Sequence, residues 1–246
     1  MLVTQLLDES HTSVYLRDTL LKIIDDWKLN GKVVAVVSDN AANIVKAIGP
    51  DGCKLTHIPC FAHSLSLVVK AAIADATEIA VTLINYRNIV TFVHSSHNAT
   101  ATLNRLRGDS SLKKLQQDVP TRLNSTLIMI RSILKMKDDV EDMLKTVDRR
   151  DLSLNDYEWD TLAGMVTILT PFEEVTTEFS SQFYPSLSKL LPVVKLLILR
   201  LNSFVANEYN PWLINLLNAL KDGMAQRFSQ IDRNVSALIA SYLDPR

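Results

Sequence analysis

Asp39 is a carboxylate in a position suited to metal binding. It follows Val33–Val37, a continuous apolar and largely β-branched run that predicts a strand buried on both faces. Open α/β sheets gather ligand-binding side chains just beyond the carboxyl ends of such strands, and a carboxylate suits a hard divalent cation. The alternative is that Asp39 caps a helix beginning at Asn40, because aspartate is a favoured N-cap residue. The sequence alone favours neither of these two interpretations over the other.

A second group of residues has the types that bind zinc. His57, Cys60 and His63 follow one another at intervals of three, with Cys53 upstream. Side chains at i, i+3 and i+6 of a helix fan over about 120° and converge poorly on one ion, whereas closed zinc sites normally take ligands from two elements. The favoured interpretation is a mostly buried Cys60 and a His63 that is hydrogen-bonded to a neighbour.

The stretch His94–His97 places nucleophile and base types side by side. Adjacent residues rarely have the geometry of a catalytic triad, so a polar loop or a helix junction is expected there. No phosphate-binding loop of the GxGxxG or GxxxxGK[ST] type occurs in the sequence.

The composition predicts a large, mainly helical core. The chain has 246 residues, of which 47% are hydrophobic and 22% charged, so intrinsic disorder is excluded. Six glycines and eight prolines leave little room for an all-β array with many tight turns. The two cysteines suit a reducing compartment, and the lack of an apolar run of about 18 residues predicts a soluble intracellular protein.

Helical periodicity extends over most of the chain. Besides Val33–Val37, residues 1–7 and 112–119 are predicted as short strands. From Arg122 onward the pattern is helical almost throughout. Earlier helices are expected at residues 14–27, 40–48, 59–74, 77–94 and 98–107. The chain is therefore predicted to change from mixed α/β to all-α near residue 122.

Charge is unevenly distributed, although the formal net charge is only −1. Residues 138–178 hold twelve acids against three bases, whereas residues 100–137 hold eight bases against two acids. The bases of this basic segment are Arg105, Arg107, Lys113, Lys114, Arg122, Arg131, Lys135 and Lys137. Such a segment can contact phosphates, but charge alone favours the interpretation that it is a solvated helix face.

Four motifs in order resemble those of hAT-superfamily transposases, and most closely those of the vertebrate BED-type zinc-finger proteins domesticated from them. The motifs are Ser38–Ile44 (SDNAANI), Cys60–Val69 (CFAHSLSLVV), Asp118–Thr126 (DVPTRLNST) and Leu243–Arg246 (LDPR). They span essentially the whole chain, and four motifs in the right order are far more specific than any one of them.

The resemblance implies an α/β plus all-α fold in which helices predominate. Residues 1–121 would form an incomplete RNase H-like core with helical segments, and residues 122–246 a large helical insertion domain. In such transposases three carboxylates hold two divalent ions for phosphoryl transfer. By the motif, Asp39 is the second of the three.

The resemblance also implies roles for residues around Asp39. Cys60 and His63 would be the CxxH pair of the family, packed near the active site, with Asn43 of the first motif also close to it. Arg122 would point toward DNA. Active members of the family carry tryptophan after this arginine, where this chain has Leu123, which offers no π-face for stacking on a flipped base.

By the same resemblance, the other two acids of the core would lie upstream and downstream of this sequence. One carboxylate cannot assemble a two-metal site, because each ion needs several oxygen ligands. The chain is therefore predicted not to be an enzyme and to need no cofactor. Mg²⁺ or Mn²⁺ is expected only with a complete core, and the BED finger and dimerisation region of the family are expected outside this chain.

These observations together predict a piece of a transposase-derived nuclear protein with a DNA-binding or transcription-regulatory role. The residues expected to contact nucleic acid are Arg105, Arg107, Lys113, Lys114 and Arg122. Two alternatives remain open, namely a piece of an active hAT transposase and a helical protein-interaction scaffold without a DNA role.

Overall fold

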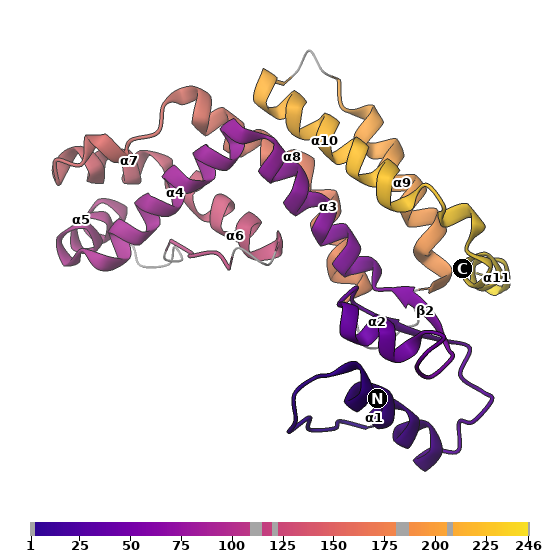
Figure 1. Ribbon diagram of the computed structural model, residues 1–246. Coiled ribbons are helices and arrows are strands. Elements are labelled where there is room, and N and C mark those ends of the chain that lie inside the picture. Colours follow the sequence, from indigo (N-terminus) through magenta and orange to yellow (C-terminus); the bar gives the residue numbers. More distant parts are fainter. Residues whose placement is uncertain (1–2, 109–114, 120–122, 181–186, 206–208, 246) are drawn as a thin grey trace. The chain divides into compact units, whose positions relative to one another are not determined.

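Figure 1 shows the computed structural model of the chain, which describes residues 3–108, 115–119, 123–180, 187–205 and 209–245. The chain divides into two compact units. The N-terminal unit comprises Met1–Ser64 with Glu178–Pro185, and the helical unit comprises Leu65–Thr177 with Ser186–Arg246. The predicted domain boundary between residues 121 and 122 falls inside the helical unit.

The N-terminal unit is built on a strand–helix–strand motif. Its two strands are parallel, with Ala35 opposite Thr56 and Ser38 opposite Pro59. The packing of α1 against α2 completes the unit, and Thr12 caps α1 by accepting a hydrogen bond from the Tyr15 amide. The elements are α1 (Ser13–Asp26), β1 (Ala35–Ser38), α2 (Ala42–Ile48), β2 (Thr56–Pro59) and the start of α3 (Phe61–Asp75).

The strand expected at Val33–Val37 forms at Ala35–Ser38, and the prediction that both its faces are buried is wrong. Val34 is 78% exposed and Val37 is 60% exposed. A strand becomes buried on both faces only where other elements cover both sides of its sheet, and the sheet in the described part of this chain has two strands. The β-branched run thus predicted the strand correctly and its burial incorrectly.

Two further strand predictions differ from the structure. Residues 3–7 form no regular secondary structure, so the described part of the predicted N-terminal strand is absent. In residues 112–119, positions 112–114 lie outside the described residues, and 115–119 form no regular secondary structure. Conversely, no strand was predicted at β2, which has only four residues and ends in a proline.

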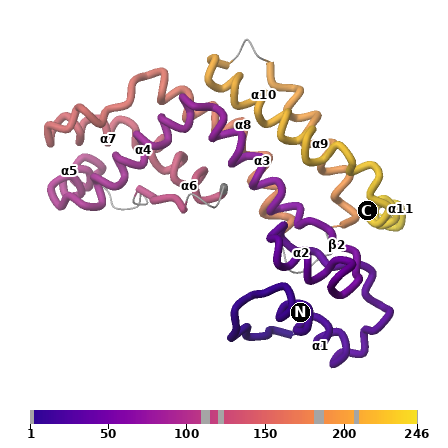
Figure 2. Tube along the Cα trace, viewed as in Figure 1, coloured from indigo at the N-terminus to yellow at the C-terminus, as the bar shows by residue number. Residues whose placement is uncertain are grey.

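The helical unit consists of helices that pack on one another in series. Figures 1 and 2 show α9 and α10 side by side, joined by contacts along their length, while α5 packs on α4 and α7. Pro171 lies inside the longest helix, α8. The helices are α4 (Thr77–Ser95), α5 (His97–Arg107), α6 (Leu123–Leu134), α7 (Lys137–Thr146), α8 (Asp156–Phe179), α9 (Leu190–Ser203), α10 (Pro211–Phe228) and α11 (Val235–Leu243), with 3₁₀ turns at Arg150–Leu152, Leu187–Lys189 and Ile231–Arg233.

The structure confirms a predominantly helical protein. Among the described residues the strands end at Pro59, so the change to all-helical structure comes much earlier than residue 122. The junction expected at His94–His97 is also confirmed, because α4 ends at Ser95 and Ser96 caps α5 by accepting the Ala99 amide hydrogen bond. No helix in the described ranges is long and apolar enough to cross a membrane.

Tyr86 occupies the centre of the helical core. Its ring is fully buried on α4, and its hydroxyl donates a hydrogen bond of 2.7 Å to the carbonyl oxygen of Met129 on α6. Burial raises the pKa of this phenol well above its ordinary value. The tyrosine therefore joins α4 to α6 by packing and by one polar contact in a dry environment.

Replacing Tyr86 with phenylalanine tests that polar contact. We expect Tyr86→Phe to lower the free energy of unfolding by about 1 kcal/mol, because one buried hydrogen bond is lost while the ring stays packed. Urea denaturation of both proteins measures the difference. Tyr157→Phe is the matched control, since the Tyr157 hydroxyl makes no hydrogen bond with the described residues, and an equal loss in both variants would contradict the expectation.

Candidate functional site

The carboxyl ends of β1 and β2 form the edge where the sequence predicted functional side chains. Because the strands are parallel, Asp39 and Cys60 each follow the last residue of a neighbouring strand. The Cys60 amide donates a hydrogen bond of 2.7 Å to the Ser38 carbonyl oxygen, which continues the strand pairing by one residue. This edge brings the first two motifs of the sequence together.

Asp39 is exposed at this edge. Its Oδ1 atom accepts a hydrogen bond of 3.3 Å from the Ala41 amide, and α2 begins one residue later, at Ala42. The residue at the N-cap position is Ala41, which makes no side-chain capping bond. Asp39 is therefore bonded just ahead of α2 and is not its N-cap residue. Within the described ranges, no three His, Cys, Asp or Glu side chains gather closely enough to hold a metal ion.

The residues of zinc-binding type differ from one another in their burial and in their contacts. Cys60 is half-buried and directly precedes α3, whereas His63 is exposed in the first turn of that helix and makes no hydrogen bond with the described residues. The expected hydrogen bond of His63 is thus missing there. Cys53 lies in the turn after α2, where its Sγ atom is 3.8 Å from the Arg17 carbonyl oxygen, and burial raises the pKa of its thiol.

His57 is hydrogen-bonded to the neighbouring strand. Its Nε2 atom lies 2.9 Å from Ser38 Oγ, and the Ser38 hydroxyl donates to the Asp39 carbonyl oxygen, also at 2.9 Å. The hydroxyl has one proton for these two contacts, so the direction of the Ser38–His57 hydrogen bond depends on the histidine tautomer. In either direction, the hydrogen bond connects a residue of β1 to a residue of β2. This serine and histidine therefore join the two strands.

Asn43 performs a similar structural task on α2. Its Nδ2 atom donates a hydrogen bond of 2.8 Å to the His11 carbonyl oxygen, and its Oδ1 atom accepts one of 2.9 Å from the Ile44 amide. The side chain thereby links α2 to the segment that leads into α1. In the structure Asn43 positions helices, and the sequence motif alone did not indicate this contact.

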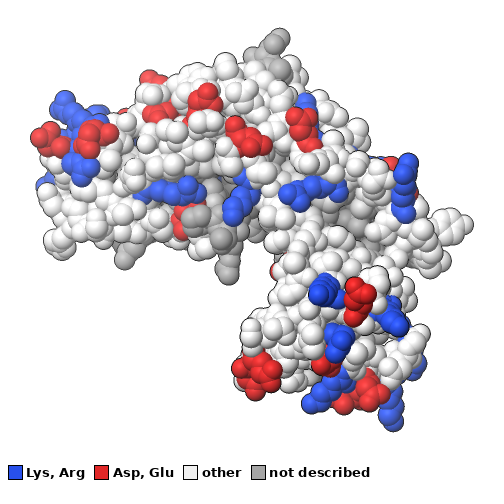
Figure 3. Space-filling model, viewed as in Figure 1, with Lys and Arg blue, Asp and Glu red and all other residues white. Residues whose placement is uncertain are grey.

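Some of the described cations in the basic segment of residues 100–137 lie close to acidic side chains. Lys113, Lys114 and Arg122 lie outside the described residues. Arg131 pairs with Glu173 at 2.6 Å, and Lys137 lies 3.7 Å from Asp156. On the face that Figure 3 draws, the helical unit carries both basic and acidic side chains.

Arg105 and Arg107 are the described cations of this segment that occupy the last turn of α5. Arg105 is exposed and Arg107 is half-buried. The next residue, Gly108, has a φ of 65°, which suits the end of a helix because glycine has no Cβ penalty there. Cations near a helix C-terminus also favour the helix dipole, so these arginines have a structural role that is independent of any partner.

The sequence interpretation missed the role of Asp118, whose side chain is 0% exposed. Its carboxylate accepts a 2.7 Å hydrogen bond from Arg87 Nη2 and two further bonds, of 3.1 and 3.2 Å, from Arg87 Nε. The Thr126 hydroxyl donates another at 3.1 Å. A buried carboxylate needs this degree of pairing, because an unpaired charge would be far less stable inside the protein than in water.

The segment around Asp118 is attached to its neighbours by side chains. Ser125 Oγ accepts the Val119 amide hydrogen bond at 2.9 Å and donates to the Val119 carbonyl oxygen at 2.8 Å. Ser132 Oγ accepts the Gln116 amide at 3.2 Å. Residues 115–119 therefore take their polar contacts from helices α4 and α6. Asp118, Ser125 and Thr126 all belong to the third sequence motif, which is the signal that could have indicated this network.

Comparison with known proteins places the chain among transposase relatives. Residues 58–168 match the family model of the ZBED1 RNase-like helical domain. "Zinc finger BED domain-containing protein 4" of Homo sapiens is 28% identical over 217 residues, which cover 87% of this chain and 18% of that protein. "Putative AC transposase" of Zea mays is 25% identical over 260 residues, which cover 96% of this chain and 31% of that protein.

A fungal protein extends the range of relatives. "Putative transcriptional regulator tpeD" of Talaromyces stipitatus is 24% identical over 209 residues, which cover 71% of this chain and 25% of that protein. The chain thus spans between about a fifth and a third of the length of these relatives. The similarity to BED zinc-finger proteins and to transposases supports a domesticated hAT-type transposase-like protein.

Removing the charge of Asp118 tests its importance for the helical unit. We expect Asp118→Asn to lower the free energy of unfolding by about 3 kcal/mol, because Arg87 then faces a neutral group in a partly buried setting. Urea denaturation provides the measurement. Asp142→Asn is the matched control, since Asp142 forms an exposed pair with Lys145, and it should cost less than about 0.5 kcal/mol. Similar costs for the two variants would disprove the anchoring role.

Proposed function

We propose that this chain is part of a nuclear, DNA-binding regulator derived from a transposase. The printed names of its relatives support this proposal, because they describe BED zinc-finger proteins and a transcriptional regulator. In the proposed protein the chain contributes contacts to DNA phosphates, while sequence recognition belongs to other parts of the longer protein. The observation that carries the proposal is the similarity of nearly the whole chain to BED zinc-finger proteins.

The proposed contact surface consists of Arg105, Arg107, Lys113, Lys114 and Arg122. Arg105 and Arg107 project from the last turn of α5, and Asp118 anchors the segment that precedes Arg122 in the sequence. Phosphate contacts need cations held by a stable scaffold, and they carry no sequence information by themselves. The buried Asp118 network supplies such a scaffold between α4 and α6.

We further propose that the chain by itself does not cleave DNA. Two-metal phosphoryl transfer needs several oxygen ligands to bridge both ions. Asp39 is exposed at its strand edge, and the described part of the chain brings no group of three possible ligands together. In this proposal the N-terminal unit is the remnant of an RNase H-like core, and the helical unit contains the insertion domain.

An active transposase is the second candidate function. The similarity of 96% of the chain to the maize protein favours it, since the name of that relative describes a transposase. In that case Asp39 would be one of three acids, and the other two would come from the remainder of a longer protein. Metal-dependent strand cleavage by the longer form is the activity that separates the two candidates.

The DNA proposal is tested by the salt dependence of binding. We expect the logarithm of the binding constant for a labelled duplex to fall steeply between about 50 and 200 mM salt. Replacing Lys113, Lys114 and Arg122 together with glutamine should reduce the slope by about 0.9 for each phosphate contact that is lost. Fluorescence anisotropy at several salt concentrations gives both slopes.

A charge-matched control distinguishes a specific surface from general electrostatics. Glutamine at Lys22, Lys32 and Lys46, which are exposed lysines of the N-terminal unit, removes the same charge elsewhere. The control should keep the slope of the unmodified chain. Equal slopes in both triple variants, or no salt-dependent binding at all, would contradict the DNA proposal and favour the protein-interaction scaffold.

The metal proposal has its own test. We expect Mg²⁺ and Mn²⁺ at millimolar concentrations to change the midpoint of thermal unfolding equally little for the chain and for Asp39→Asn, because one exposed carboxylate binds a cation weakly. Differential scanning fluorimetry measures the midpoints. A large stabilisation that disappears in Asp39→Asn would show a tight site and overturn the proposal of an incomplete metal centre.

A further inference from the structure

One face of α11 is an exposed apolar surface of the helical unit (Figure 1). Four apolar side chains recur there at positions i, i+3, i+4 and i+7, so they lie in one stripe along the helix. This α11 stripe consists of Val235, Leu238, Ile239 and Tyr242, all of them exposed, and Tyr242 is 90% exposed. The helix contains no charged residue. An uncharged apolar stripe of this kind is typical of a surface that binds another protein chain.

The opposite face of α11 attaches the helix to the rest of the unit. Ala237 is fully buried, and α11 packs on α9 and on the 3₁₀ turn Leu187–Lys189. The Ser241 hydroxyl donates a hydrogen bond of 2.6 Å to the Ser188 carbonyl oxygen. The Ser188 hydroxyl donates one of 2.5 Å to Oδ2 of Asp244, just beyond the helix. These contacts hold α11 in one orientation, with the α11 stripe turned away from the protein.

The size of this surface matches the apolar area that a dimer interface needs. Leu243 adjoins the α11 stripe and is 72% exposed. With about 150 Å² for a fully exposed large side chain, Leu243 and the stripe together present on the order of 500 Å². A stable interface buries about 800 Å² on each partner, and roughly 65% of it is apolar between two copies of one protein. The surface of α11 therefore supplies the apolar part of such an interface.

The order of the residues along α11 fits a second copy that runs in the opposite direction. A two-fold axis between Leu238 and Ile239 sets each of these side chains against the other one in the second copy. The same alignment sets Val235 against Tyr242 of the second copy, because both lie equally far from the axis. Each apolar side chain of the stripe thus meets another apolar side chain.

The charges at the two ends of α11 fit the same alignment. Arg233 lies two residues before the helix and is exposed, and Asp244 follows its last residue. Antiparallel pairing about the axis places Arg233 opposite Asp244 of the second copy, at both ends of the contact. Opposite charges at the rim favour this register, because a parallel arrangement would set like charges side by side.

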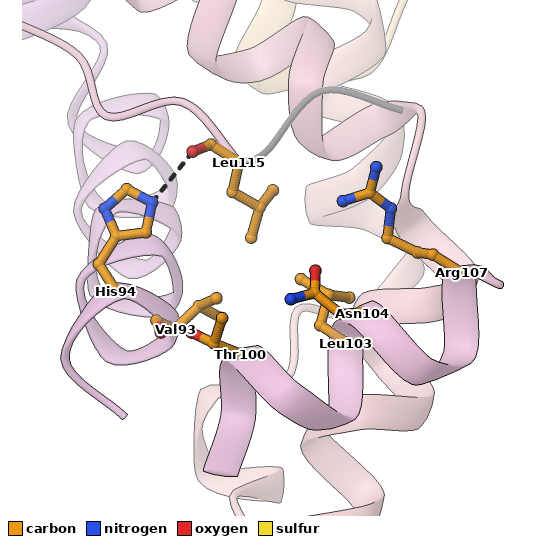
Figure 4. Close-up of a pocket in the computed structure, with 7 residues that line it drawn as sticks. All are labelled: Val93, His94, Thr100, Leu103, Asn104, Arg107 and Leu115. Atoms are coloured by element: carbon orange, nitrogen blue, oxygen red, sulfur yellow. Dashed lines mark hydrogen bonds between the residues drawn. The ribbon is translucent and has the colours of Figure 1, made fainter. Parts of the chain in front are cut away.

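We propose that the chain forms a two-fold symmetric dimer in which the α11 stripes of two copies pack on each other. Such a contact uses both stripes completely, so association ends at the dimer. It is separate from the cavity that α4, α5 and residue 115 line (Figure 4), and from the dimerisation region that the family resemblance places outside this chain. It also goes beyond the proposed DNA contact, whose residues lie outside α9 and α11.

The mass of the 246-residue chain in solution tests this proposal. Sedimentation equilibrium should show a reversible change from 27.6 kDa to twice that mass as the concentration rises. We expect a Kd of about 10⁻⁶ M, because lost translational and rotational freedom offsets much of the gain from apolar burial. Raising the salt concentration from about 0.1 to 0.5 M should change the Kd less than about threefold, since the charges lie only at the rim.

Two isoleucine variants locate the contact. Ile239→Arg should raise the Kd at least about a hundredfold, because it places two like charges beside the two-fold axis. Ile84→Arg should leave the Kd within about threefold of the unmodified chain. Ile84 on α4 is the matched control, since it is 53% exposed and Ile239 is 54% exposed, both on helices of the helical unit. Circular dichroism of each variant monitors folding.

Crosslinking gives a second measurement that introduces no charge. Ile239→Cys should form a covalent dimer with a short bismaleimide, because the two thiols lie close to the axis. Ile84→Cys and the unmodified chain, which contains Cys53 and Cys60, provide the background. This comparison decides the question even if Ile239→Arg fails to fold.

Three outcomes would overturn the proposal. A chain that stays monomeric up to about 100 μM would show that another segment or another protein covers the α11 stripe. Equal effects of the Ile239 and Ile84 variants would place the dimer contact elsewhere. A mass that continues to grow beyond the dimer would show open association in place of a closed two-fold contact. The salt dependence of DNA binding is measured separately, so a failure of the DNA proposal would leave this result unaffected.

Discussion

The buried carboxylate of Asp118 sets the arrangement of the helices around it. Removing such a group from water is expensive, and the cost is offset only when several donors surround it in good geometry. Arg87 on α4 and Thr126 on α6 supply those donors, so the two helices and the segment between them must keep one relative position. The same segment carries Val119, whose two backbone polar groups bond to Ser125. A single motif of the sequence thus contains both an anchor and, in the proposed function, a DNA-contacting arginine.

The strand edge of the N-terminal unit has a different character. Its hydrogen bonds connect the two strands, between His57 and Ser38 and between the Cys60 amide and the Ser38 carbonyl. These bonds keep the carboxyl ends of the strands together without any metal. Asp39 is exposed beside them, and an exposed carboxylate is well solvated and therefore stable without a counterion.

The sequence predicted the local features of this fold far better than the non-local ones. Helices are determined by apolar spacing and by caps such as Thr12, which act within one turn, so most of them were found. Burial of Val34 depends on what covers the sheet, and this information lies elsewhere in the chain. Residues 115–119 have a strand-like sequence pattern, but their backbone polar groups bond to side chains of α4 and α6, and the pattern cannot reveal that difference. The ion pair of Asp118 could not be predicted either, because its partner Arg87 is 31 residues away in the sequence.

The basic and acidic segments of the chain are separate in the sequence but partly adjacent in the structure. The separation of basic and acidic segments along the chain suggested a phosphate-binding stripe, but folding brings parts of the two segments together. Arg131 pairs with Glu173 and Lys137 lies near Asp156, so these cations are partly neutralised by the acidic segment. The interpretation of a solvated face thus applies to one part of the basic segment. In the proposed function, the cations expected to contact a nucleic acid are Arg105, Arg107, Lys113, Lys114 and Arg122. Phosphate contact needs only such cations on a fixed scaffold, whereas strand cleavage needs three acids in one place. Loss of cleavage would therefore leave the helical scaffold and its capacity for binding intact.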